Sequence, residues 1–364
     1  MCDIRELYIK QLSPETPQQE REEALNMISS FYENPHSVLI LLQQMSTEEN
    51  ESIRHLSAIG LGRSLNLNWK KHILNSEYSE VVKEQLIKNY MNESNTVIRH
   101  RLIYSSRPVL RTDSEKWPQF FQMISELTSN GSHLNNIEFA LYAISHLIPN
   151  LAPNTVSHYL NLFIGLIMNS FVTDNQELIS TACGLCSVLL ASDGLTKEEL
   201  PLFVEPFQKM LEIFANSLSS GDDKYIIKIT EKICFAMSKS QIPIPIENVL
   251  QFLLNDCVNI HPIYAYGPII DLISAHGGEL ISMLDQIIQV TLSVASNLLV
   301  YGTYEENENS MYVLLAIEKS AATMKEKTFF EYLFSHIPTS TTKEAIISAM
   351  VISRVISISE YVIK

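Results

Sequence analysis

Two cysteines, Cys183 and Cys186, have the CxxC spacing that serves both metal binding and thiol–disulfide exchange. A structural zinc site needs four ligands, and the sequence has no second pair of this kind. The two cysteines lie inside an apolar run, TACGLCSVLL, whose pattern is helical and has no strand–helix–strand context. We therefore expect small buried side chains here, with neither metal nor redox chemistry.

The sequence Gly60-Leu61-Gly62 is similar to the start of a dinucleotide-binding fingerprint. The third glycine is absent and no strand precedes the pair, so the glycines predict close helix packing instead. The ten histidines form no metal-type pair such as HExxH, and the sequence assembles no Ser/His/Asp or Cys/His grouping. We expect a protein that is not an enzyme and that uses no cofactor and no metal.

These glycines lie in the stretch that the other elements must surround, Glu51 to Lys71. Read as a helix, it is apolar on most of its circumference, through Ile53, Leu56, Ala58, Ile59, Leu61 and Leu65. A helix that is hydrophobic nearly all round must be buried on several sides. This pattern favours an inner helix of a stack, with a partner helix outside and similar helices above and below.

Helical periodicity continues along the chain, and alternating strand patterns are nearly absent. The first, or A, helix of each pair is predicted at 3–12, 36–45, 77–91, 117–130, 153–170, 200–217, 245–257, 278–298 and 327–336. The second, or B, helix is predicted near 17–32, 50–65, 95–110, 134–148, 174–192, 222–239, 262–276, 304–324 and 341 to the end. The B helices begin mostly about 40 residues apart, the period of HEAT and armadillo repeats. The sequence thus predicts an all-α fold, a HEAT-repeat α-solenoid of antiparallel helix pairs.

The last stretch, SAMVISRVISISEYVIK, is largely apolar. The end of a natural solenoid carries a polar capping face. We therefore expect that more repeats follow in the parent protein or that a partner covers this end, the alternative being a divergent native terminus.

The net charge is −15, from 26 basic and 41 acidic residues. Residues 1–110 hold 12 basic and 14 acidic residues, a balance of −2, and the remaining residues contribute −13. This charge argues against a nucleic-acid-binding surface, which would be basic. It favours the attraction of cationic protein partners, and the alternative is an acidic surface that only aids solubility.

The five cysteines are odd in number and scattered, which indicates a reducing compartment rather than a disulfide framework. The N-terminal sequence MCDIRELYIKQ is polar and has no signal-peptide core. Apolar runs such as Leu162–Met168 and Val290–Val300 are too short or too interrupted to cross a bilayer. We expect no membrane insertion.

The N-terminal part of the chain resembles the N-terminal domain of the importin-β (karyopherin-β) superfamily. The segments that carry the resemblance are EEAL (22–25), FYENP (31–35), LILL (39–42), IRHLSA (53–58), NWKK (68–71), VIRH (97–100) and KWP (116–118). Within the superfamily the likeness is nearest to the importers of ribosomal proteins and histones. Beyond about residue 150 it consists of periodicity and repeat layout.

The resemblance implies a superhelical HEAT array with A helices on the convex side and B helices on the concave side. It implies that residues 1–110 bind the GTPase Ran in its GTP form and that residues 111–364 continue the same solenoid. It also implies basic protein cargo, such as a ribosomal protein or histone, and nucleoporin FG repeats between the outer helices. Such a receptor works in the cytoplasm, in the nucleus and at the nuclear pore of the nuclear envelope. The alternative is a static HEAT-repeat scaffold or adaptor for a protein complex.

The free faces of the first three B helices supply the candidate binding residues. The predicted core-facing residues are Ala24, Leu25, Ile28 and Phe31 on the first B helix, and Val97, Ile98, Leu102 and Val109 on the third. At 100° per residue, the opposite faces carry Glu22, Asn26, Tyr104 and Arg107. Arg63 is the polar candidate on the helix between them.

The resemblance places Ran on these faces, so we predict that the GTPase contacts several of these five residues. The alternative is that they only solvate their helices, as most polar helix faces do, or bond to adjacent repeats. For basic cargo we predict an acidic site that contains Glu305, Glu306 and Glu308.

Overall fold

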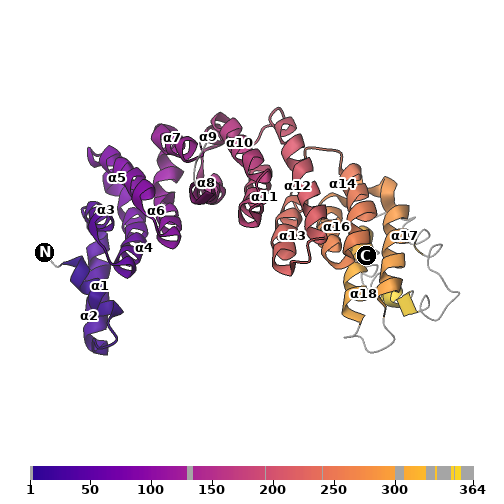
Figure 1. Cartoon of the computed structure of the whole chain (residues 1–364), viewed down its shortest axis with the longest axis horizontal. Coiled ribbons are helices and arrows are strands. Elements are labelled where there is room, and N and C mark those ends of the chain that lie inside the picture. The colour runs from indigo at the N-terminus through magenta and orange to yellow at the C-terminus, as the bar shows by residue number, and fades with distance from the viewer. Residues whose placement is uncertain are drawn as a thin grey trace, which may run out of the picture. The chain divides into compact units, whose positions relative to one another are not determined.

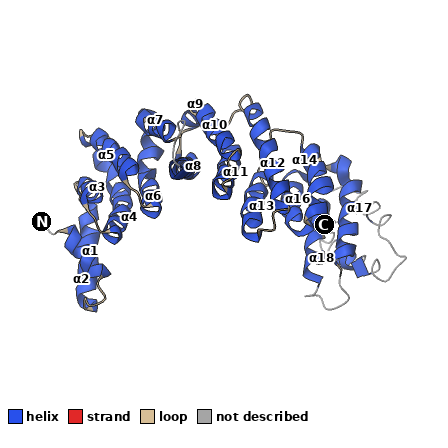
Figure 2. Ribbon diagram, viewed as in Figure 1, coloured by secondary structure: helices blue, strands red, loops and turns tan. Residues whose placement is uncertain are grey.

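The computed structural model describes residues 3–128, 134–192, 194–239, 241–299 and 307–324, together with 333, 346–347 and 349–353. In these residues the secondary structure is helical throughout, and no strand occurs (Figure 2). The all-α prediction is confirmed. The chain divides into two compact units: unit 1 is residues 1–173 with 192–195, and unit 2 is residues 174–191 with 196–364.

Unit 1 consists of paired helices that succeed one another along the chain (Figure 1). Its A helices are α1 (Ile4–Leu12), α3 (Ser37–Thr47), α5 (Tyr78–Asn92), α7 (Pro118–Leu127) and a split helix, α9 (Pro153–His158) and α10 (Leu160–Phe171). Its B helices are α2 (Gln18–Glu33), α4 (Glu51–Asn68), α6 (Thr96–Asp113) and α8 (Leu134–Leu147). Each B helix packs against the next, α2 against α4, α4 against α6 and α6 against α8.

Unit 2 continues the same alternation. Its B helices are α11 (Gln176–Leu190), α13 (Asp223–Met237), α16 (Pro262–His276) and the split pair α18 (Glu308–Val313) and α19 (Leu315–Met324). Its A helices are α12 (Val204–Leu218), α14 (Ile246–Phe252), α15 (Val258–Ile260) and α17 (Leu284–Leu298), with a π-helical turn at Leu253–Cys257. The predicted ninth pair, 327–336 and 341 to the end, lies almost entirely outside the described residues.

A repeated capping residue marks the start of several B helices. The side chains of Asn50, Asn95 and Asn175 accept hydrogen bonds from the second and third backbone amides that follow them. Asp222 does the same for α13. A capping side chain satisfies amides that have no partner inside the helix, so each turn from an A helix to a B helix ends at a defined residue.

Two predicted core faces are partly wrong. On α2 the buried residues are Ala24, Ile28 and Tyr32, a four-residue step that leaves Leu25 49% exposed. On α6, Ile98, Leu102 and Val109 are buried as predicted, but Val97 is 62% exposed. Both exposed residues lie next to a buried one, where a rotation of 100° turns the side chain away from the neighbouring helix.

The inner position predicted for Glu51 to Lys71 is confirmed for α4, which packs against α2, α3 and α6. Ile53, Ala58, Leu61 and Leu65 are buried, whereas Leu56 and Ile59 are half-buried. The helix ends in a π-helical turn, Trp69–Ile73, that buries the Trp69 ring and directs its Nε1 to Thr112 Oγ1 at 2.8 Å. Among the described residues, no helix combines the length and apolarity needed to cross a membrane.

Candidate functional site

Two glycines of α4 set how closely its neighbours approach. A Cβ at Gly60 would lie 2.5 Å from Tyr8 Oη and 2.7 Å from Tyr32 Oη, the two phenols that share a buried hydrogen bond of 2.9 Å. A Cβ at Gly62 would lie 3.0 Å from Ser105 Oγ on α6. These glycines serve close helix packing, as the sequence predicted.

The close approach brings α6 into register with α4. Ser105 donates a hydrogen bond to the Ala58 carbonyl at 2.7 Å, and it lies opposite Gly62. With the Trp69–Thr112 bond, these contacts align the two helices along their length. These contacts hold α6 against α4. One stripe of α6 consists of Arg101, Tyr104, Arg107 and Arg111, spaced three or four residues apart. Arg101 and Arg111 are exposed, whereas Tyr104 and Arg107 are half-buried.

Tyr104 and Arg107 belong to a stacked group that we call the α6–α8 cluster, His100, Tyr104, Arg107, Tyr142 and His146. The rings of His100 and Tyr142 are parallel, with centroids 3.5 Å apart. His146 stacks on the other side of Tyr142 at 4.0 Å. Tyr104 meets His146 edge-on at 5.4 Å, and the Arg107 guanidinium lies 4.1 Å from the centre of the Tyr104 ring. A row of half-buried rings with a cation at one end results.

The polar atoms of this cluster are partly satisfied within the protein. His100 Nε2 lies 3.2 Å from Glu138, and His146 Nδ1 lies 2.9 Å from the Tyr142 carbonyl oxygen. Burial, and to a lesser degree the hydrogen bond with Tyr104, raises the pKa of Tyr142, so this phenol stays protonated at neutral pH. Arg107 Nε is buried without a hydrogen-bond partner among the described residues.

The five predicted Ran-binding residues are not all brought together. Tyr104 and Arg107 contact each other, whereas Arg63 lies exposed on α4 and Glu22 and Asn26 lie exposed on α2. Glu22 accepts a hydrogen bond from the Gln18 amide at 3.1 Å. The sequence did not reveal His100, Tyr142 and His146 as members of the site. The sequence does contain a four-residue spacing of rings on each of the two B helices, His100 to Tyr104 and Tyr142 to His146. Only the packing of α6 on α8 shows that these rings contact one another.

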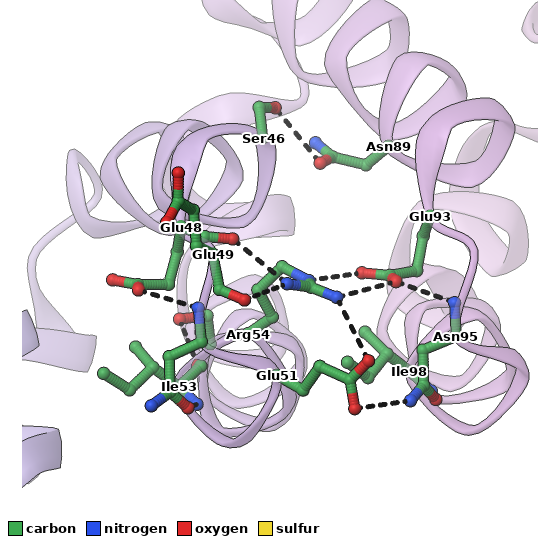
Figure 3. Close-up of polar contacts among 12 residues, drawn as sticks. Ser46, Glu48, Glu49, Glu51, Ile53, Arg54, Asn89, Glu93, Asn95 and Ile98 are labelled. Atoms are coloured by element: carbon green, nitrogen blue, oxygen red, sulfur yellow. Dashed lines mark hydrogen bonds and ion pairs between the residues drawn. The ribbon is translucent and has the colours of Figure 1, made fainter.

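A polar network joins the turn that precedes α4 to the turn that precedes α6 (Figure 3). Arg54 Nε is 2.9 Å from Glu93 Oε2, and Arg54 Nη1 donates to the carbonyl oxygens of Glu48 and Glu49 at 3.1 and 2.8 Å. Hydrogen bonding to Glu93 outweighs burial and raises the pKa of Arg54. Asn95, the cap of α6, donates to Glu51 at 3.2 Å. The turns before α4 and α6 are thereby joined.

A buried ion pair fixes the opposite end of α6. Lys83 Nζ on α5 lies 2.6 Å from Asp113 Oδ2, with side chains only 2% and 6% exposed. Lys83 also donates to Glu80 at 2.9 Å and to the Lys116 carbonyl at 3.3 Å. Burial alone would lower the pKa of Lys83, but its hydrogen bonds to Asp113 and Glu80 outweigh burial and raise it.

A second surface feature lies between the A helices α5 and α7. It is a groove of about 320 Å³ lined by Glu84, Ile87, Lys88, Met91, Gln119, Gln122, Met123 and Glu126. Its apolar lining residues are Ile87, Met91 and Met123, which we call the apolar floor, and Met91 is 45% exposed. The groove can take a small apolar or aromatic side chain.

The residues that suggested other chemistry have structural roles. Cys183 and Cys186 are fully buried in α11, and burial raises the pKa of the Cys186 thiol to about 12. In the described part of the chain, no group of three His, Cys, Asp or Glu side chains is placed to hold a metal. Of the predicted cargo residues, Glu308 is exposed at the start of α18, whereas Glu305 and Glu306 lie outside the described residues.

Comparison with known proteins places these features in a family context. Residues 22–92 match the family model described as the importin-beta N-terminal domain. The crystal structure of Kap121p bound to Ste12p has a TM-score of 0.71 at 16% sequence identity, over 96% of this chain and 36% of Kap121p. Kap121p bound to RanGTP gives 0.70 at 16% identity, over 97% and 36%. Kap121p bound to Nup53p gives 0.72 at 15% identity, over 97% and 36%.

These similarities concern the fold, because the identities are low. They agree with the predicted HEAT-repeat solenoid. The chain spans little more than a third of the length of the Kap121p structures. No curated protein sequence matches it.

Proposed function

We propose that the chain is a nuclear transport receptor. Residues 22–92 match the importin-beta N-terminal domain, and the HEAT-repeat solenoid is similar to that of the karyopherin Kap121p. The observation that carries the proposal is the domain match, which covers α3, α4 and α5 and most of α2. The matched structures include one bound to RanGTP and one bound to Nup53p. The receptor moves between the cytoplasm and the nucleus through the pores of the nuclear envelope.

We place Ran, in its GTP form, on the B helices of residues 1–110. The proposed contacts are Glu22 and Asn26 on α2, Arg63 on α4, and Tyr104 and Arg107 on α6. The support is that Glu22, Asn26 and Arg63 are exposed, and that Tyr104 and Arg107, which are half-buried on α6, are already stacked on each other. A preformed surface loses little conformational entropy when a partner binds.

We place the other partners on different parts of the chain. Nucleoporin FG repeats use the groove between α5 and α7, whose apolar floor suits a phenylalanine side chain. Basic cargo, of the ribosomal-protein or histone type, is attracted by unit 2, which includes Glu305, Glu306 and Glu308. The charge supports this, because unit 2 holds 12 basic and 22 acidic residues, a net of −10, against 14 and 19, a net of −5, in unit 1.

The test is capture of purified Ran by the immobilised chain, with Ran loaded with GTP or GDP. We expect capture of the GTP form, and we expect Arg63→Glu with Arg107→Glu to weaken it by about tenfold or more through charge reversal at the interface. Lys70→Glu with Lys71→Glu is the matched control, because both lysines are exposed in the turn after α4. Equal capture of both nucleotide forms, or of neither, would favour the scaffold alternative.

A further inference from the structure

Four arginines on the B helices of unit 1 have no ion pair and no side-chain hydrogen bond among the described residues. They are Arg63, Arg101, Arg107 and Arg111, in a chain that has an excess of 15 acidic residues. The other arginines of unit 1 are bonded within the protein: Arg5 pairs with Glu48 at 2.6 Å, Arg54 pairs with Glu93 at 2.9 Å, and Arg21 and Arg99 donate to the carbonyl oxygens of Pro14 and Tyr90, each at 2.8 Å. We call the four unbonded arginines the arginine face.

The arginine face belongs to two helices that pack against each other, α4 and α6. Arg101, Arg107 and Arg111 follow one stripe of α6. Arg63 is exposed on α4, directly after Gly62, whose missing side chain faces Ser105 of α6. The four guanidinium groups thus belong to adjacent helices that the buried contacts hold in place.

Stacking prepares two of these groups for a planar ligand. The Arg107 guanidinium lies 4.1 Å from the centre of the Tyr104 ring, and that of Arg101 lies 6.0 Å from the same ring. A guanidinium that stacks on a ring keeps its N–H donors in its own plane, where a carboxylate can accept two parallel hydrogen bonds. Tyr104 itself is held by Tyr142 and His146, so the donors are oriented before a ligand arrives.

We propose that the arginine face binds an acidic segment of a partner protein, through its carboxylates on Arg101 and Arg107 and with Arg63 and Arg111 adding attraction. A protein segment fits better than a nucleic acid, because it brings a few carboxylates to a few arginines, whereas a net charge of −15 repels a dense polyanion more strongly at long range. This inference rests on the proposed function, because it specifies the chemistry of a partner that binds the surface assigned to Ran.

The experiment titrates the whole chain into a fluorescent synthetic peptide of glutamate, tyrosine and glycine and follows anisotropy. The matched probe has glutamine at every glutamate position. We expect binding of the glutamate peptide only, with affinity that falls as salt is added. Arg101→Gln with Arg107→Gln should weaken it by about tenfold or more, since two charge-assisted contacts are lost.

The control removes the same charge elsewhere: Lys197→Gln with Lys224→Gln, both exposed in unit 2, should leave binding unchanged. Arg101→Gln alone, an exposed change that leaves the Tyr104–Arg107 stack in place, should also weaken binding. The proposal is overturned if both peptides bind equally, if the control pair is as harmful, or if a single-stranded oligonucleotide binds the same arginines more tightly than the glutamate peptide. Peptide binding without Ran capture would refute the proposed function alone, and Ran capture without peptide binding would refute this inference alone.

Discussion

Gly60 is the residue at which three helices of unit 1 meet, because the phenols of Tyr8 and Tyr32 occupy the space that its missing side chain leaves. An added methyl group cannot move the two rings easily, since both are buried and hydrogen-bonded to each other. The residue therefore fixes the distance from α4 to α1 and α2.

Replacing Gly60 by alanine should lower the free energy of unfolding by about 1–3 kcal/mol through overpacking. The matched control is Gly165→Ala in α10, where a Cβ meets nothing within 4 Å. There alanine should be neutral or stabilise by up to about 1 kcal/mol, because it favours the helix. Chemical denaturation of both variants measures the difference, and equal effects would contradict the assigned packing.

The Lys83–Asp113 pair should be costly to break on one side only. Asp113→Asn leaves the buried ammonium with the exposed Glu80 as its carboxylate partner and should cost about 3 kcal/mol, the low end for a broken buried pair, whereas Lys83→Met with Asp113→Leu should be much closer to wild type. Chemical denaturation at neutral pH compares the three proteins. If the single change were as mild as the double change, the pair would not be buried as described.

The same pair gives a pH dependence. The pKa of Lys83 is raised in the folded protein, so its stabilisation is fully present below the ordinary value of 10.5 and is lost as pH rises through the folded value. Wild type should therefore lose stability faster above that pH than Lys83→Met with Asp113→Leu. Burial also raises the pKa of tyrosines such as Tyr90, so they too reduce the stability of the folded protein as the pH rises through this range. Both proteins contain these tyrosines, so their effect cancels in the difference.

Predictions about single residues succeeded where the position of the residue depends on one helix and not on how two helices pack. The 100° rotation placed Tyr104 and Arg107 away from the buried face of α6, where both are half-buried, and the buried CxxC followed from its apolar run. It could not show that Tyr142 stacks between His100 and His146, because these rings lie on two helices whose register depends on packing. Leu25 and Val97 were misassigned for the same reason.

At the scale of the element, the order of the helix pairs was predictable, and most of their bounds were predictable to within a few residues. A proline at the first helical position marks the boundary locally at Pro118, whereas the cap at Asn50 was found only in the structure. The π-helical turn at Trp69–Ile73 and the break between α9 and α10 were not predicted. Both depend on how a helix end fits its neighbours, as when Trp69 turns its indole toward Thr112.

The groove between α5 and α7 gives the prediction at this scale. Met91→Glu places a carboxylate in its apolar floor and should weaken binding of a Phe-Gly peptide by roughly tenfold. Met27→Glu is the matched control, since Met27 is 46% exposed on α2 and Met91 is 45% exposed. Calorimetric titration measures both. Equal weakening by the two variants would place FG binding elsewhere.

At the scale of the whole molecule, the charge is unevenly divided between the two units, with −10 in unit 2 and −5 in unit 1. Glu231→Gln with Glu308→Gln removes two exposed carboxylates from B helices of unit 2. A lysine-rich cargo peptide should then bind about twofold more weakly per charge removed, and its salt dependence should flatten. Anisotropy titrations at several salt concentrations measure this, with Glu23→Gln and Glu33→Gln in unit 1 as the control pair. If the control pair had the same effect, only the total charge would attract the peptide.

The hydrogen bonds between successive helix pairs also affect how the chain folds during translation. Arg54 reaches Glu93 across 39 residues of sequence, Trp69 reaches Thr112 across 43, and Ser105 reaches Ala58 across 47. A ribosome adds about 5–20 residues per second, so the partner of Arg54 follows it after roughly two to eight seconds. Each pair can close on its predecessor while the next is still being translated. The nascent chain then exposes the apolar surface of little more than one helix pair at a time, so its need for chaperones does not increase with its length.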